Sequence, residues 1–186
     1  MHYAIVAGMQ SPSPITFEPV LAEELPDFIL RVQESFSVAV REKFGTDSPI
    51  PSAATIRRSY SAPGAETYHL LREGQRIGGV ILSINRQTRY NEPEIFFLSP
   101  QQSGHGWGLE AWQAIEQRYP DTPVWETGTP YFEERNIHFY VNKCGFRIVE
   151  FYNKYHPAPE MPEGEDEDPD DDCGFFRFEK LMAPQH

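Results

Sequence analysis

The sequence has few of the features that mark disulfide-rich, membrane-spanning or nucleic-acid-binding proteins. Its two cysteines, Cys144 and Cys173, are too few for a disulfide framework and too far apart for a metal knuckle. No apolar run approaches the roughly 20 residues of a transmembrane helix, and the first residues lack the basic flank and long apolar stretch of a signal peptide. Basic residues are outnumbered, 16 against 28 acidic ones, so no nucleic acid is expected as a partner. These absences predict a cytoplasmic protein with no membrane partner.

The excess of negative charge is concentrated in one segment. Nine of the 28 acidic residues lie between Glu160 and Asp172, and the rest of the chain holds 19 acidic residues against 16 basic ones. Blocks of like charge are usually solvated. We therefore expect an acidic loop over 157–172, with attraction of a cationic substrate or partner as the alternative role.

What the chain does contain is typical of one globular domain. Of its 186 residues, 39% are hydrophobic and 13% are aromatic, enough for a substantial core. Residues 1–14 are expected to form an N-terminal tail and residues 15–186 a single domain.

Apolar residues spaced four apart predict a helix over 21–45, with Pro26 in its first turn and Gly45 at its end. Further helices are expected over 51–62, from the glycines near 106 to Tyr119, and over 132–146. The inward face of the second of these should carry Trp107, Ala111, Ile115 and Tyr119. Alternating or apolar stretches predict strands over 15–20, 91–99, 122–128, 146–155 and 173–182, and a hairpin over 66–85 that turns at 73–75. This order favours a mixed α/β or α+β sheet.

One stretch has an unusual amount of bare backbone just before a helix. It reads PQQSGHGWGLEAW from Pro100 to Trp112, with glycines at every second position from Gly104 to Gly108. The first amides of a helix lack partners within the helix, and glycine lets a ligand approach the backbone closely. The stretch therefore predicts a cradle for a phosphate or pyrophosphate, with a tight strand-to-helix turn as the alternative.

Two common phosphate-binding motifs do not fit this stretch. The P-loop requires Lys-Ser/Thr after its last glycine, whereas Leu109 and Glu110 follow here. The dinucleotide fingerprint requires two further residues between its second and third glycines within a βαβ unit. Here only one residue separates them, and antiparallel strands are expected before them.

The stretch instead resembles motif A of the GNAT acetyltransferase family, in which a strand leads into Pro-x-x-(Gln/Arg)-Gly-x-Gly-x-Gly/Ala. Pro100 and the three glycines fall in register, and Ser103 stands where the family usually has Gln or Arg. Residues 134–152 look like motif B of the same family, a helix with Phe-Tyr near its end and a Gly-Phe exit into a strand. The resemblance implies a mostly antiparallel sheet of about six or seven strands flanked by about four helices.

The resemblance also implies which residues form the site. Coenzyme contacts are expected from Leu98, Ser103, Gly104, His105, Gly106, Trp107, Gly108 and Asn136. Tyr140 matches the tyrosine that serves many family members as general acid, although it could also be an ordinary core aromatic. The helix has one residue more than usual between Tyr140 and Gly145, and the family's common Asn aligns with Glu133.

Acetyl transfer to an amine also needs a general base, and three carboxylates are candidates. Glu126 is favoured because a carboxylate within the otherwise apolar strand PVWETG is unusual. Glu94 and Glu92 are the alternatives, expected by strand alternation to share a face with Phe96 and Leu98. His138 is a further alternative, and Cys144 is expected to be a small packed residue.

The sequence is thus interpreted as a single-domain N-acetyltransferase that uses acetyl-coenzyme A as co-substrate, by direct transfer and without metal. The expected acceptor is a primary amine of a small molecule or peptide, and a homodimer is among the expected assemblies because dimers are common in the family. The alternative is a non-catalytic module of the same fold that binds coenzyme A or a protein partner.

Overall fold

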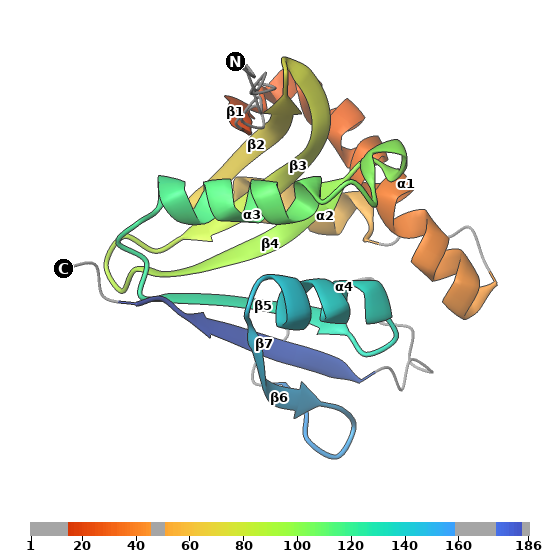
Figure 1. Ribbon diagram of the computed structural model, residues 1–186. Coiled ribbons are helices and arrows are strands. Elements are labelled where there is room, and N and C mark those ends of the chain that lie inside the picture. The colour runs from red at the N-terminus through yellow and green to blue at the C-terminus, as the bar shows by residue number, and fades with distance from the viewer. Residues whose placement is uncertain (1–14, 46–50, 159–173, 184–186) are drawn as a thin grey trace, which may run out of the picture.

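The computed structural model describes residues 15–45, 51–158 and 174–183, so the acidic segment Glu160–Asp172 lies outside the described residues. A seven-stranded sheet with the order β1-β2-β3-β4-β5-β7-β6 forms the centre of the molecule (Figure 1). The strands are β1 (Thr16–Pro19), β2 (Ala65–Arg72), β3 (Gln75–Ile84), β4 (Tyr90–Leu98), β5 (Val124–Pro130), β6 (Arg147–Tyr152) and β7 (Phe175–Leu181). All neighbours are antiparallel except β4 and β5, which confirms the mixed, mostly antiparallel sheet.

Helices cover both faces of the sheet. The core on one face is built with α1 (Leu25–Phe44) and α2 (Ala53–Ser61), and the core on the other with α3 (Trp107–Arg118) and η3 (Phe139–Lys143), a π-helical turn that continues α4 (Glu134–His138). Two short 3-10 turns, η1 (Ala22–Glu24) and η2 (Pro100–Gln102), precede α1 and α3. The four expected helices are therefore confirmed. In the described part of the chain, no helix combines the length and apolar character needed to cross a bilayer.

Local sequence signals explain where several elements begin and end. The hydroxyl of Ser52 accepts the amide of Thr55 and caps α2, and Gly45 ends α1 in the left-handed conformation at φ +62°. Glu73 and Gly74 both have positive φ, as a two-residue hairpin turn between β2 and β3 requires.

The sheet divides between β4 and β5. Only two residue pairs join these strands, Tyr90 with Val124 and Asn91 with Trp125, and beyond them the strands separate (Figure 1). The side chain of Asn91 donates to Thr122 over 2.7 Å and holds the joined end together. The other ends of the two strands are thereby left open toward the helices.

A β-bulge changes the direction of the side chains along β4. Ile81 pairs with Ile95 and Leu82 with Pro93, so Glu94 is an extra residue on β4. Phe96 faces the core that contains α3, whereas Glu92 pairs with Ser83 on the face of α1 and α2. The expectation that Glu92 and Glu94 share a face with Phe96 and Leu98 is therefore wrong, because it assumed uninterrupted alternation.

The inward face of α3 also differs in part from the prediction. Ala111 and Ile115 are fully buried as expected, but the third buried residue is Trp112, whereas Trp107 and Tyr119 are only partly buried. The indole of Trp112 packs edge-on against that of Trp125 on β5, with ring centroids 5.3 Å apart. This contact holds α3 over the joined part of β4 and β5.

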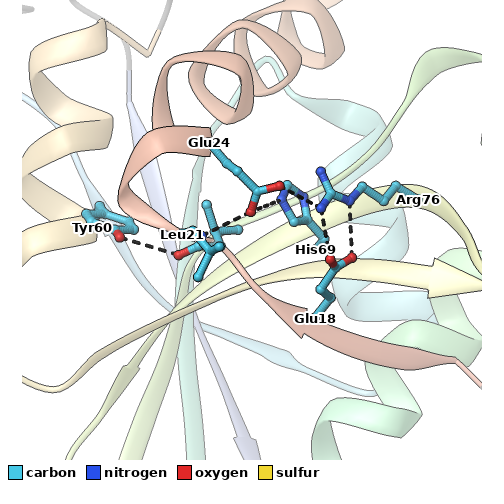
Figure 2. A network of polar contacts seen from close by, with 7 residues as sticks. Glu18, Leu21, Glu24, Tyr60, His69 and Arg76 are labelled. Atoms are coloured by element: carbon cyan, nitrogen blue, oxygen red, sulfur yellow. Dashed lines mark hydrogen bonds and ion pairs between the residues drawn. The ribbon is translucent and has the colours of Figure 1, made fainter.

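A polar network fastens the first strand to the sheet (Figure 2). Arg76 on β3 donates to Glu18 on β1 and to Glu24 in η1, at 3.0 and 2.7 Å. His69 on β2 lies beside this network, with its Nε2 3.6 Å from a Glu24 oxygen (Figure 2). The imidazole is 1% exposed, and neither ring nitrogen has a hydrogen-bond partner. Burial without a hydrogen-bond partner therefore favours the neutral form of the His69 ring.

Candidate active site

A cleft of about 960 Å³ opens where β4 and β5 have separated. Its walls come from the second half of α1, the end of β4, the glycine loop between β4 and α3, and the helical segment α4–η3. Motif A and motif B, which are separated by an entire strand in the sequence, therefore face the same space.

The glycine loop presents unpaired backbone amides to this cleft. Gly104 and Gly106 have φ of +85° and +81°, and a Cβ at either position would meet no atom within 4 Å. The amides of Leu109 and Glu110 donate to the carbonyl of Gly106, so helical hydrogen bonding begins there. Within the described part of the chain, no hydrogen bond reaches the amides of Gly104–Gly108. The loop thus has the donors, the open space and the positive helix end that an anion requires.

Six of the eight residues expected to contact coenzyme line the cleft, namely Leu98, Ser103, Gly104, Gly106, Gly108 and Asn136. His105 and Trp107 lie in the same loop but are not part of the lining. Their rings stack on each other at 4.7 Å, and the guanidinium of Arg72 lies 5.1 Å from the Trp107 ring. These two side chains shape the outer side of the loop.

Gly108 has a packing role in addition to lining the cleft. A Cβ at this position would lie 3.2 Å from the ring of Phe139 and 3.7 Å from Leu98. The Phe139 ring in turn stacks on Phe96 of β4, with centroids 5.7 Å apart and an interplanar angle of 13°. The absent side chain allows α3 to approach η3 closely, which fixes the width of the cleft.

Tyr140 lines the cleft and is also part of the core. It is 6% exposed and contacts the rings of Phe146 and Phe178. Burial raises its pKa well above the ordinary value, a hydrogen bond with Thr127 lowers it, and Glu92 adds a smaller upward contribution. The phenol is therefore held protonated, within electrostatic range of Glu92. Both sequence interpretations of Tyr140, general acid and core aromatic, are compatible with this location.

The extra residue of motif B is accommodated by η3. The amide of Cys144 donates to the carbonyl of Phe139, five residues back, at 3.0 Å. The chain then leaves the turn through Gly145 at φ +80°, and the amide of Phe146 donates to the backbone carbonyl of Tyr140. Such π turns frequently occur at functional sites, and this one lies directly beside the cleft.

The three candidate bases have different surroundings. Glu126 lies 3.7 Å from Arg177, which also pairs with Glu150 and Glu179. Glu94 is the exposed bulge residue. Glu92 is half-buried and has no hydrogen bond or ion pair within the described residues. Burial, with smaller contributions from the other two carboxylates, raises the pKa of Glu92 to about 7. Burial also raises the pKa of Glu94, but Glu92 is the less exposed of these two carboxyls and has a pKa suited to accepting a proton at neutral pH. None of the three candidate bases is among the residues that line the cleft.

The remaining candidates have simpler explanations. Cys144 is 3% exposed, and burial raises the pKa of its thiol to about 12, so it is a packed residue as expected. His138 lines the cleft but is exposed, and its Nδ1 lies 3.0 Å from the side-chain amide nitrogen of Asn142. Arg135 and Lys143, not assigned a role from the sequence, line the cleft without an ion pair among the described residues. Only their position within motif B could have indicated this.

Comparison with known proteins gives one match in sequence among curated proteins and many matches in structure. No protein-family model matches the chain. YrkN of Bacillus subtilis (strain 168) is 50% identical over 175 residues, which cover 90% of this chain and 94% of YrkN. Among solved structures, the ribosomal-protein-S18-alanine N-acetyltransferase of Escherichia coli is similar with a TM-score of 0.65 at 12% identity, over 92% of this chain and 96% of that one.

A GNAT family acetyltransferase from Elizabethkingia anophelis, solved with acetyl-CoA bound, is also similar. Its TM-score is 0.59 at 16% identity, and the match covers 90% of this chain and 98% of that one. At these identities the similarity concerns the fold. The chain therefore belongs to the same protein family as YrkN, and it has the fold of the GNAT acetyltransferases.

Proposed function

We propose that the protein is an N-acetyltransferase that transfers an acetyl group from acetyl-coenzyme A to a primary amine. The observation that carries this proposal is the row of unpaired amides at Gly104–Gly108, which opens on the same cleft as Tyr140. A cytoplasmic location, a homodimer and independence from metal stay predictions.

The cleft suits a coenzyme with phosphate groups and an extended arm. The amides of the glycine loop would bind the pyrophosphate, and the cations of Arg135 and Lys143 would offset further phosphate charge. The volume of about 960 Å³ is in the range of sites for ligands of this size. Leu98 and Phe139 supply apolar surface between the loop and Tyr140. When bound, the coenzyme supplies an activated thioester.

Glu92 is proposed to remove the proton from the acceptor. A lysine-like amine has a pKa near 10.4, so only about one molecule in 2,500 is neutral at pH 7. A carboxylate whose own pKa is about 7 can accept that proton, directly or through a water molecule. Since Glu92 faces the side of α1 and α2, the acceptor would approach from that side of the gap.

Tyr140 is proposed to protonate the leaving thiolate from the opposite side. Its hydroxyl is held by Thr127, on the face of α3 and η3. In this proposal, the acceptor and the thioester meet at the point where β4 and β5 separate, between the two faces of the sheet. Proton removal from the amine and proton delivery to the sulfur are thus assigned to different sides.

The test measures coenzyme binding and turnover separately. Calorimetry with coenzyme A should show binding, and thiol release from acetyl-coenzyme A should be stimulated by at least one member of a panel of diamines, amino-acid amides and peptides with free N-terminal amines. Mass spectrometry should then find one added acetyl group on that amine. Binding without turnover across the panel would support the non-catalytic alternative, and absence of binding would reject both.

A further inference from the structure

Glu133 is a buried carboxyl to which the proposed chemistry gives no role. It is 8% exposed, precedes the first residue of α4 and lines the cleft. Its side chain makes no capping hydrogen bond to the helix. Within the described part of the chain no other hydrogen bond or ion pair reaches it. Burial of a carboxyl without a partner is costly, so a ligand in the cleft is the natural partner.

Burial favours the neutral form of Glu133. It is the largest influence on the pKa of this carboxyl and raises it, and the carboxylate of Glu42 on α1 makes a smaller upward contribution. Arg135, two residues along the chain, lowers the pKa by more than Glu42 raises it, but by less than burial does. A coenzyme carrying several phosphate charges would add to the repulsion of an ionised carboxylate.

We propose that Glu133 binds the coenzyme in its protonated form, with its carboxyl O–H donating to an oxygen of the coenzyme. This inference rests on the proposed function, because it requires coenzyme A in the cleft. Above the pH at which free Glu133 ionises, each binding event then takes up one proton from solvent. Coenzyme affinity is therefore highest at low pH and weakens as the pH rises.

The test compares the wild-type protein with Glu133→Gln, whose amide reproduces the donor of the protonated acid at every pH. Calorimetry gives the Kd for coenzyme A at several pH values from 5.5 to 8.5. The quantity of interest is the ratio of the wild-type Kd to the variant Kd at each pH, because ionisation of the coenzyme cancels in it. We expect a ratio near 1 at pH 5.5 that rises to about tenfold or more at pH 8.5.

Glu134→Gln is the matched control, since Glu134 lines the same cleft but its side chain is exposed, so water can solvate its carboxyl without a ligand. Its ratio should not change with pH. A flat ratio for Glu133→Gln, or equal slopes for the two variants, would overturn the inference while leaving coenzyme binding intact. A wild-type protein that binds no coenzyme A at any pH would instead reject the proposed function.

A second ligand identifies which coenzyme oxygen accepts the bond. Adenosine 3′-phosphate 5′-diphosphate keeps the phosphates of coenzyme A and lacks the pantetheine arm. If the rise in the ratio is equal for both ligands, the acceptor is a phosphate oxygen. If the ratio for the shorter ligand stays within about twofold of 1 at every pH, the acceptor is a carbonyl of the pantetheine arm. Urea unfolding of Glu133→Gln checks that the variant is folded under each condition.

Discussion

The hydroxyl of Thr127 donates to the carbonyl of Pro93 over 3.2 Å, across the point where β4 and β5 separate. The backbone ladder between these strands has already ended at Asn91 and Trp125. The side-chain bond therefore extends the connection to the apex of the gap, directly beside the hydroxyl of Tyr140. The base side and the acid side of the proposed reaction are joined by this one contact.

Replacement of Thr127 by Val should destabilise the protein. The carbonyl of Pro93 would lose its hydrogen bond in a buried place, at a cost of about 1–3 kcal/mol. Urea unfolding measures the change. Thr129→Val is the control, because Thr129 is 2% exposed on the same strand but has no side-chain hydrogen bond among the described residues. Equal losses in the two variants would show that the bridge contributes nothing specific.

Glu92→Gln should lower kcat/KM by about 10²–10⁴ through loss of the general base. In the wild type, activity should fall as the pH drops through about 7, because Glu92 takes up a proton there. Rates measured from pH 5.5 to 9 should lose this acidic limb in the variant. Glu126→Gln, which removes a carboxylate already paired with Arg177, should keep it. An unchanged limb in Glu92→Gln would assign the base elsewhere.

Tyr140→Phe should reduce kcat while the Kd for coenzyme A stays within about twofold. The phenol acts on the leaving group, so its loss affects turnover more than binding. Tyr60→Phe also deletes a hydroxyl that bonds to the backbone, the 3.4 Å contact with Val20, and should leave kcat unchanged. Full activity of Tyr140→Phe would restrict Tyr140 to its packing role.

Gly106→Ala should weaken coenzyme A binding at least about tenfold, because a Cβ would stand where the anion is bound. Gly74→Ala provides a control for backbone strain. Gly74 has a φ of +75°, also with open space around it, but lies in the β2–β3 turn outside the cleft. Both variants should lose about 1 kcal/mol of stability, and only Gly106→Ala should lose affinity in calorimetry. Equal affinities would place the anion elsewhere.

His69 should make the protein less stable in acid. Burial lowers its pKa, Arg76 and Arg31 act in the same direction, and Glu24 and Glu18 oppose them. Since the unfolded chain takes up a proton near pH 6.5 and the folded protein does so only at lower pH, the folded state loses up to about 1.4 kcal/mol per pH unit below 6.5.

His69→Leu should be less affected by acid than the wild type in urea unfolding at pH 5 and pH 8. His156→Gln is the control, because the side chain of His156 is 57% exposed and pairs with Glu150. Its difference in stability between pH 5 and pH 8 should match that of the wild type. If His69→Leu and the wild type lose the same stability between pH 8 and pH 5, another group causes the acid sensitivity.

The sequence was sufficient to predict the elements and the position of the glycine loop before α3, because both depend on local patterns. Helical spacing located α1, and the glycine register located the loop next to α3. The sequence could not predict which side chains of β4 lie on which face of the sheet, because nothing local distinguishes Glu94 from an ordinary strand residue. Its bulge arises from pairing with β3, a contact between distant segments.

The same limit applies to the charged residues of the site. The pairing of Glu126 with Arg177 depends on β7 lying beside β5, and the burial of Glu133 depends on the packing around the cleft. The sequence favours Glu126 as the base because a carboxylate is unusual within an apolar strand, but it does not reveal the partner Arg177 on a distant strand. Trp112 was missed on α3 because its burial depends on Trp125 of β5.

The turn η3 has a consequence for how the family can vary. A wider turn takes up one residue over a short length, so the chain on either side keeps its orientation toward the sheet. Tyr140 can therefore stay at the cleft while Phe146 stays in the core, although the count between them differs from the usual motif. A gap at this point in a comparison of sequences thus marks a local change in winding. Residues before the gap should be aligned from Tyr140, and residues after it from Phe146.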